Sequence, residues 1–168
     1  MVPALGPGQA PGPGPERLLV ELVIFSGCPG AGKTTFYTTT FLHTHVRISL
    51  DMLKTRRREA LLAQACIATK LRLVIDNTNP TRDDRAKYID WARGSRFRVI
   101  GYTFESAMEG LVARNAVRTG RARVPVAVIH RIFETLETLT FAEGFDRLFR
   151  VHAEDHGRFH VEEDHYEE

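Results

Sequence analysis

The chain has 168 residues, of which 43% are hydrophobic and 26% are charged, a composition typical of one globular domain. It contains no apolar run of the roughly eighteen residues that a membrane-spanning helix needs, and its start lacks the features of a secretory signal. We therefore expect neither a membrane protein nor a secreted one. The two cysteines, Cys28 and Cys66, lie in unrelated contexts, which favours a reducing, cytoplasmic compartment.

Charge and composition divide the chain into three parts. Residues 1–16 contain five prolines and four glycines, so we expect a disordered leader there. Residues 152–168 carry seven acids and one base, and we expect this acidic, histidine-containing tail to be disordered or loosely attached. Because the whole chain has a net charge of +2, the predicted domain at residues 17–151 is basic. A basic domain suits an anionic partner such as ATP or nucleic acid, although basic surfaces are also common.

Within the predicted domain, apolar stretches that fit buried strands alternate with stretches that fit helices. We predict strands at residues 18–26, 46–49, 71–75, 97–103 and 145–151. We predict helices at residues 33–41, 52–69, 81–93 and 105–118, and a further helix that starts at Pro125. This alternation predicts an α/β fold with a five-stranded parallel sheet and helices on both faces, of the P-loop kinase type.

A phosphate-binding loop is the strongest motif. Residues 27–34, GCPGAGKT, match the pattern G-x-x-x-x-G-K-[ST] in full, between a predicted strand and a predicted helix. In such a loop the glycines let main-chain N–H groups approach phosphate oxygens, the lysine neutralises the outer phosphates, and the hydroxyl can bind Mg²⁺. The motif predicts ATP and Mg²⁺ as cofactors. The predicted nucleotide-binding residues here are Gly27, Cys28, Pro29, Gly30, Ala31, Gly32, Lys33, Thr34 and Thr35.

Two acids follow the next two predicted strands, at the sheet edge where such folds bind ligands. Asp51 could accept a proton from an attacking hydroxyl, or it could simply cap the helix expected from Met52. Asp76 could bind Mg²⁺ or contact the acceptor, or it could serve as a cap or turn residue. Asn79 lies in a turn after this strand, and we include it among the predicted substrate-binding residues.

The segment at residues 114–125, RNAVRTGRARVP, has the composition of an arginine-rich lid. Arg114 and Arg118 are four residues apart and share one helix face, and Gly120 then interrupts the helix. A hinged loop with several guanidinium groups can close over a triphosphate and neutralise charge in the transition state. The alternative is a solvated basic face.

These segments together resemble the kinase domain of polynucleotide 5′-hydroxyl kinases. The likeness is carried by GCPGAGKTT, ISLDMLK, VIDNTNP and RNAVRTGRARVP, with a weaker match in TFAEGFDRLF. The resemblance implies that Asp51 is the general base and that Lys54 contacts an acceptor phosphate. It also implies that Arg118, supported by Arg114, faces the transferring phosphate, and that Asp76 lies near the metal and the acceptor. Nothing resembles a phosphatase or ligase module, so we expect a kinase domain that stands alone.

Three functional hypotheses follow. The first is a kinase that phosphorylates the 5′-OH end of DNA or RNA, with Asp51, Lys33 and Arg118 as the catalytic residues. The second is a kinase of a small hydroxyl substrate such as a nucleoside, sugar or antibiotic. Leu50 and Lys54 favour it because the family usually has arginine at both positions, and lysine lacks arginine's two-pronged grip. The third is a nucleotide-binding regulatory module with little or no transfer.

Overall fold

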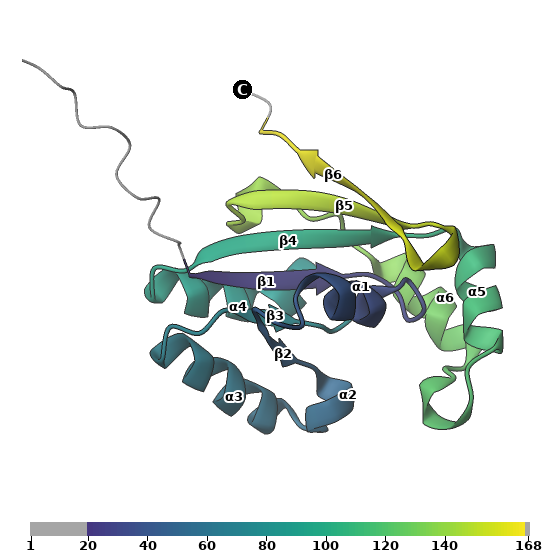
Figure 1. The fold of residues 1–168 in the computed structure, drawn as a ribbon, viewed down its shortest axis with the longest axis horizontal. Helices are drawn as coiled ribbons and strands as arrows, with labels where there is room; N and C mark the ends of the chain where they lie inside the picture. The colour runs from purple at the N-terminus through teal and green to yellow at the C-terminus, as the bar shows by residue number, and fades with distance from the viewer. Residues whose placement is uncertain (1–19, 167–168) are drawn as a thin grey trace, which may run out of the picture.

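The computed structural model describes residues 20–166, so the leader predicted at residues 1–16 lies outside the described part. The described chain forms a sheet with the strand order β2-β3-β1-β4-β5-β6 (Figure 1). The first five strands of this order pair in parallel, and β6 pairs with β5 in the antiparallel direction. The strands are β1 (Glu21–Ser26), β2 (Val46–Ile48), β3 (Leu73–Ile75), β4 (Arg98–Glu105), β5 (Arg147–Ala153) and β6 (Phe159–Asp164).

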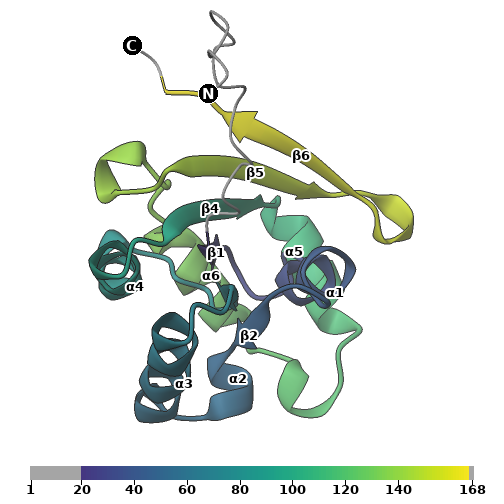
Figure 2. The ribbon, with the colours of Figure 1, turned by 60° about the vertical axis from the view of Figure 1, so that its left-hand side comes forward.

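Helices cover both faces of the sheet, as Figure 2 shows with α3 and α4 on one side and α1 and α5 on the other. The α-helices are α1 (Lys33–Thr40), α2 (Leu50–Leu53), α3 (Arg56–Ala68), α4 (Arg82–Gly94), α5 (Met108–Ala116) and α6 (Val126–Thr135). Short 3₁₀ helices lie at η1 (Gly120–Ala122), η2 (Phe141–Glu143) and η3 (Asp155–Gly157). The predicted α/β fold with helices on both faces of a mostly parallel sheet is confirmed.

The central strand β1 explains the most apolar stretch of the sequence. Leu22, Val23, Ile24 and Phe25 are all 0% exposed, because β1 has neighbouring strands on both edges and helices on both faces. Successive side chains of a strand point to opposite faces. Accordingly Leu22 and Ile24 belong to one buried cluster with residues of α3 and α4, and Val23 and Phe25 belong to a second with residues of α1, α5 and α6.

The single helix predicted at residues 52–69 is wrong, because the chain forms two helices there. Helix α2 begins two residues earlier, at Leu50, and ends at Leu53. Lys54 then adopts a left-handed conformation with φ of 71°, which a continuous helix does not allow. Thr55 starts α3 by accepting a hydrogen bond from the Arg58 N–H at its side chain. The break at Lys54 therefore separates α2 from α3.

The prediction that residues 152–168 form a loose tail is also wrong for the part that the structure describes. Residues Phe159–Asp164 form β6, which raises the strand count from the predicted five to six. Arginines of β5 neutralise two of the acids in β6: Arg147 pairs with Glu163 at 2.7 Å, and Arg150 pairs with Asp164 at 2.8 Å. Phe159 packs its ring against Phe36 of α1, with the ring centres 5.1 Å apart. Ion pairs across the hairpin and this aromatic contact together order the segment.

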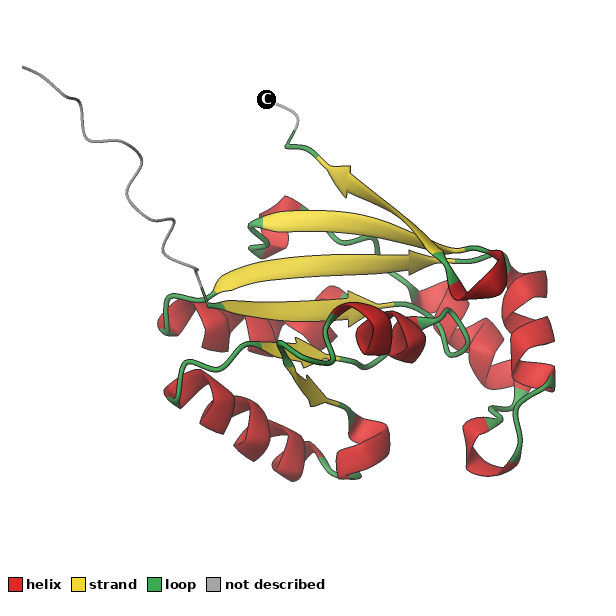
Figure 3. Ribbon diagram, in the orientation of Figure 1, coloured by secondary structure: helices red, strands yellow, loops and turns green. Residues whose placement is uncertain are grey.

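The loops that follow the parallel strands gather at one end of the molecule. In Figure 3 the arrowheads of β1 and β4 point toward the end where α5, α6 and the lid lie, and the β6 arrow points the opposite way. Ligands of doubly wound sheets bind at this carboxyl edge. None of the helices in the described residues has the length and apolarity that crossing a membrane requires.

Candidate active site

The loop after β1 lies against the neighbouring strand ends and runs directly into α1. The Gly27 N–H donates to the Thr78 carbonyl oxygen at 3.0 Å, and a side chain at Gly27 would meet the Cβ of Phe104 at 2.8 Å. Gly32 precedes α1 with φ of 97°, a conformation that favours glycine. The first N–H groups of a helix have no partner within the helix, and they favour an anion. The local geometry therefore suits phosphate binding.

Lys33 is the first residue of α1, and its ammonium group folds back over the loop. It donates to the carbonyl oxygens of Gly27 at 2.8 Å and of Cys28 at 2.7 Å. Burial lowers the pKa of Lys33 to about 8, an effect that the nearby Asp76 opposes. A bound phosphate could accept hydrogen bonds from the Lys33 ammonium group in place of these two carbonyls. Because the phosphate is negatively charged and the ammonium group is poorly solvated, this contact would be strong.

Thr34 and Asp76, the two residues predicted to bind the metal ion, lie next to each other. The Thr34 hydroxyl lies 3.3 Å from Asp76 Oδ2, and the Asp76 side chain is buried. A hydroxyl and a carboxylate are the oxygen ligands that Mg²⁺ prefers, and Mg²⁺ needs only one or two protein ligands beside water and phosphate. The donor set therefore fits the ion.

Arg47 is a residue of this site that the sequence analysis missed. It projects from β2, donates from Nε to Asp76 Oδ2 at 2.7 Å, and donates from Nη2 to the Thr34 hydroxyl at 3.2 Å. Arg47 belongs to no recognisable motif in the sequence. The one available signal is that it lies four residues before Asp51, close to the predicted acceptor segment. The contact becomes visible once β2 and β3 are paired.

Asp51 lies in the first turn of α2, and its side chain is exposed. The alternative that Asp51 caps a helix is wrong, because α2 begins at Leu50 and the cap position belongs to Ser49. Lys54, three residues on, ends α2 in its left-handed conformation. Both residues line the same cavity as the phosphate loop.

A buried polar network fixes the start of α2. The Leu50 N–H donates to Asn77 Oδ1 at 2.9 Å, and Asn77 Nδ2 donates to Glu59 Oε2 at 2.8 Å. Glu59 is 0% exposed and also accepts from the Tyr88 hydroxyl at 2.7 Å and from Arg56 at 3.1 Å. Burial raises the pKa of Glu59, but the hydrogen bonds from Tyr88 and Asn77 and the positive charge of Arg56 together bring the pKa below its usual value. The network is thus a charged anchor one residue from Asp51.

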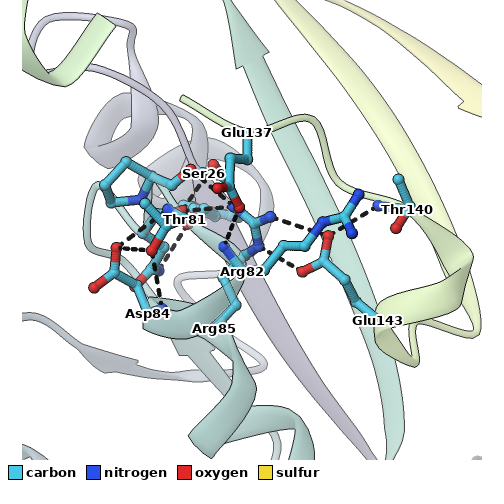
Figure 4. A network of polar contacts seen from close by, with 11 residues as sticks. Ser26, Thr81, Arg82, Asp84, Arg85, Glu137, Thr140 and Glu143 are labelled. Atoms are coloured by element: carbon cyan, nitrogen blue, oxygen red, sulfur yellow. Dashed lines mark hydrogen bonds and ion pairs between the residues drawn. The ribbon is translucent and has the colours of Figure 1, made fainter. Parts of the chain in front are cut away.

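Asn79, predicted to bind substrate, lies away from the cavity. It is 2% exposed, its Nδ2 donates to the Phe25 carbonyl at 2.8 Å, and its carbonyl accepts from Ser26 Oγ at 3.0 Å. The Arg85 guanidinium also donates to this carbonyl at 3.0 Å and is held by Glu143 at 2.8 Å; Figure 4 shows Arg85 and Glu143 facing each other beside the loop. Asn79 therefore fastens the loop after β3 to the end of β1. The residues of this turn that do line the cavity are Asn77 and Thr78.

The arginines of the lid have different positions. Arg118 and Arg121 line the cavity, and Arg118 Nη1 donates to the Ala122 carbonyl at 3.4 Å. Arg123 is exposed on the surface. Arg114, predicted to bind the nucleotide, instead donates from Nε to the Gly30 carbonyl at 2.6 Å and from Nη2 to Ser106 Oγ at 3.0 Å. Arg114 therefore supports the main chain of the phosphate loop. The sequence spacing had instead predicted that it lies beside Arg118 and binds the nucleotide.

One cavity of about 620 Å³ unites these elements. The phosphate loop and the start of α1 form one side, α2 and the ends of β2 and β3 form the opposite side, and the lid borders both. Its volume is in the range of sites for small molecules and cofactors. The lining residues are Pro29, Gly30, Gly32, Lys33, Thr34, Thr35, Arg47, Leu50, Asp51, Lys54, Asp76, Asn77, Thr78, Arg118, Arg121, Ala122 and Val124.

This fold and this phosphate loop define a P-loop nucleotide-binding domain of the kinase-like type. The family model described as "AAA domain" matches residues 22–139, which is most of the described chain. The chain therefore belongs to the AAA domain family.

A curated relative and two solved structures are similar to the chain. The bifunctional polynucleotide phosphatase/kinase of Schizosaccharomyces pombe is 26% identical over 144 residues, which is 85% of this chain and 33% of that protein. Kti12 of Chaetomium thermophilum, in complex with ADP-AlF3, has a TM-score of 0.64 at 14% identity and covers 81% of this chain and 92% of its own. A gluconokinase of Sinorhizobium meliloti has a TM-score of 0.53 at 19% identity, with 81% and 84% covered.

The chain thus spans about a third of the length of the curated S. pombe relative. At these identities the two solved structures show a shared fold.

Proposed function

We propose that the chain is a Mg²⁺-dependent kinase that transfers the γ-phosphate of ATP to the 5′-OH end of DNA or RNA. The observation that carries the proposal is the single cavity in which the phosphate loop with Lys33 faces Asp51 and Lys54. The same stretch of sequence is shared with a relative named for polynucleotide kinase activity. Both the geometry and the relationship support a hydroxyl acceptor opposite a nucleotide.

On the donor side, Lys33 and the main-chain N–H groups at the start of α1 hold the phosphates, and Arg118 faces them from the lid. Thr34 and Asp76 would hold Mg²⁺, which supplies charge neutralisation between the phosphates when it is bound. These groups lower the energy of the transferring phosphoryl group because they oppose the charge that gathers on its oxygens.

On the acceptor side, Asp51 takes the proton of the 5′-hydroxyl while the hydroxyl oxygen forms a bond to the γ-phosphorus. The bond between the γ-phosphorus and the bridging oxygen breaks in the same transfer and ADP leaves. Lys54 lies one turn from Asp51 and supplies a cation for an acceptor phosphate. The neighbouring Arg57 and Arg58 are exposed, and they extend the positive charge beyond the cavity, whereas Arg56 pairs with Glu59.

A second candidate is a kinase of a small hydroxyl substrate, and Leu50 favours it. Leu50 lines the cavity beside Asp51, so the acceptor meets an apolar side chain at this point. A phosphodiester gains nothing from such a contact, whereas the carbon skeleton of a sugar or nucleoside does.

The deciding experiment supplies labelled ATP and Mg²⁺ with 5′-OH oligonucleotides and with a panel of nucleosides, sugars and aminoglycosides. A 5′-phosphorylated oligonucleotide is the matched control acceptor. We expect label on the 5′-OH oligonucleotide alone. Label on a small molecule alone would replace the first candidate by the second, and nucleotide binding without any labelled acceptor would favour a regulatory module.

The role of Asp51 is tested with Asp51→Asn. We expect at least about a hundredfold slower transfer with nearly unchanged ATP affinity, because the base acts on the acceptor and not on the nucleotide. Asp83→Asn is the control, because Asp83 is an exposed acid in the first turn of α4 and does not line the cavity. Parent-like transfer in Asp51→Asn would remove Asp51 from the mechanism.

A further inference from the structure

Arg47 donates hydrogen bonds to the same two oxygen atoms, Asp76 Oδ2 and the Thr34 hydroxyl, that could bind a metal ion. Its Nε donates to Asp76 Oδ2 at 2.7 Å, and its Nη2 donates to the Thr34 hydroxyl at 3.2 Å. The Thr34 hydroxyl and Asp76 Oδ2 are themselves 3.3 Å apart. A single guanidinium therefore contacts both members of the pair at once.

A divalent ion and this guanidinium cannot share the pair without cost. Both are cations, and both need the lone pairs of the same hydroxyl and the same carboxylate oxygen. Like charges that lie a few ångströms apart near a protein surface repel each other, because solvent screens them only in part. One cation must therefore give up the pair when the other takes it.

The surroundings of Arg47 allow it to leave. Its side chain is 22% exposed and lines the cavity, whereas the side chain of Asp76 is 2% exposed. Away from Asp76 and Thr34, Arg47 has looser contacts, with the Met52 sulfur at 3.7 Å from Nη1 and the Tyr37 ring centre 5.9 Å from the guanidinium carbon. Arg85 shows the opposite case: it is 0% exposed and bonded on several sides by Glu143, Asn79 and Pro80.

We propose that Arg47 is an exchangeable cation of the phosphate site: it competes with the divalent ion for Asp76 and, when displaced, binds phosphate oxygens in the cavity. The proposal rests on the proposed function, because it takes Thr34 and Asp76 as the metal site of a nucleotide-binding cavity. It makes Arg47 a determinant of how much Mg²⁺ the protein needs. It also keeps Asp76 neutralised by one cation or the other.

Exchange predicts two opposite effects of removing the guanidinium. In Arg47→Met the metal meets no competitor, so the Mg²⁺ concentration that half-saturates ADP binding should fall about tenfold. At saturating Mg²⁺, the affinity for a non-hydrolysable ATP analogue should fall about tenfold, since a charge-assisted contact with phosphate is lost. A side chain with a merely structural role would not move these two quantities in opposite directions.

The measurement is a titration of a fluorescent ADP and of the ATP analogue over a series of Mg²⁺ concentrations. Arg98→Met is the matched control, because Arg98 is a half-buried arginine that opens β4 and does not line the cavity. Arg47→Lys should give a smaller shift of the same sign, as lysine keeps the charge and loses the fork. An unchanged or higher Mg²⁺ requirement in Arg47→Met overturns the proposal.

Folding provides a second test. Arg47→Met leaves the buried Asp76 carboxylate without its guanidinium, so its unfolding temperature should fall, and Mg²⁺ without nucleotide should recover more of it than in the parent. If Arg47→Met does not fold, Arg47→Lys alone decides by its Mg²⁺ requirement. These measurements concern binding and not phosphoryl transfer. If the protein binds Mg²⁺ and nucleotide but phosphorylates no 5′-OH end, the proposed function is wrong, and the proposal for Arg47 can still be tested.

Discussion

The two sides of the cavity are built in different ways. The donor side, residues 27–35 with Arg114 behind them, is made mainly of main chain: Gly27 bonds to the Thr78 carbonyl, and Arg114 supports the Gly30 carbonyl. The acceptor side, residues 49–54, is held by side chains, because its N–H at Leu50 bonds to Asn77 and Asn77 bonds to the buried Glu59. One side depends on a backbone conformation, and the other on a network of polar side chains.

The difference has a physical consequence. A loop of glycines before a helix presents its donors wherever the chain folds that way, so its function needs few particular side chains. A network of buried polar groups is satisfied only when all its members are present, and one loss leaves the others unpaired. The donor side should therefore tolerate changes around it, whereas the acceptor side should respond to a change several residues from the cavity.

The largest effect should follow from the loss of Lys33 on the donor side. Lys33→Met should slow phosphoryl transfer about a thousandfold and weaken ATP binding, because it removes the ammonium charge that the phosphate loop itself brings to the outer phosphates. The stability of the protein should change little, since methionine removes a half-buried cation together with its two carbonyl contacts. Rates from labelled ATP and affinities from calorimetry check this expectation, and Lys33→Met with parent-like affinity and rate would refute the assignment of the donor side.

A large effect on the acceptor side should come from Glu59, although it does not touch the cavity. Glu59→Ala removes the partner of Tyr88 and Asn77 and should lower the free energy of unfolding by about 3 kcal/mol. Transfer should slow about tenfold or more as Leu50 and Asp51 lose their anchor, while ATP affinity stays within about twofold. Glu134→Ala, an exposed acid on α6, is the control for urea unfolding and for kinetics. Equal losses of nucleotide affinity and transfer would show that the two sides are not independent.

Arg114 gives a smaller effect on the donor side. Arg114→Met removes the hydrogen bonds to the Gly30 carbonyl and to Ser106, and it should weaken nucleotide binding three- to tenfold, or about 1 kcal/mol. The KM for the acceptor should not change, because Arg114 supports the loop and not α2. Arg123→Met, on the exposed part of the lid, is the control. A rise in the acceptor KM alone would contradict this division of the cavity.

The donor side was easier to predict from the sequence than the acceptor side, because it is one continuous loop and does not depend on contacts between distant side chains. The phosphate loop is one continuous motif, so its residues and their shared function could be listed before any fold was known. Asp51 and Lys54 could also be proposed from the sequence, because they follow a predicted strand closely, and both line the cavity. Asn79 was assigned to substrate binding and instead bonds to Phe25, since the direction of a turn residue depends on the strand beside it.

Contacts between distant residues explain what the sequence could not supply. Glu59 meets Asn77 and Tyr88 only because α3 and α4 pack on the same face of the sheet. Arg47 meets Asp76 only because β2 and β3 pair in register. The strand β6 was missed because its acids suggest a solvated tail, and the arginines that neutralise them belong to β5.

The smallest expected effect is a dependence of nucleotide affinity on pH. Burial lowers the pKa of Lys33 to about 8 in this structure, and phosphate bound to the ammonium group would raise it. Binding then favours the protonated lysine, so affinity should be constant below about pH 8 and fall above it, by at most tenfold per pH unit. Calorimetry in buffers of different ionisation heats should show proton uptake near pH 8.5 in the parent and less in Lys33→Met. Proton release at that pH, or no dependence at all, would mean that this ammonium group does not hold the phosphates.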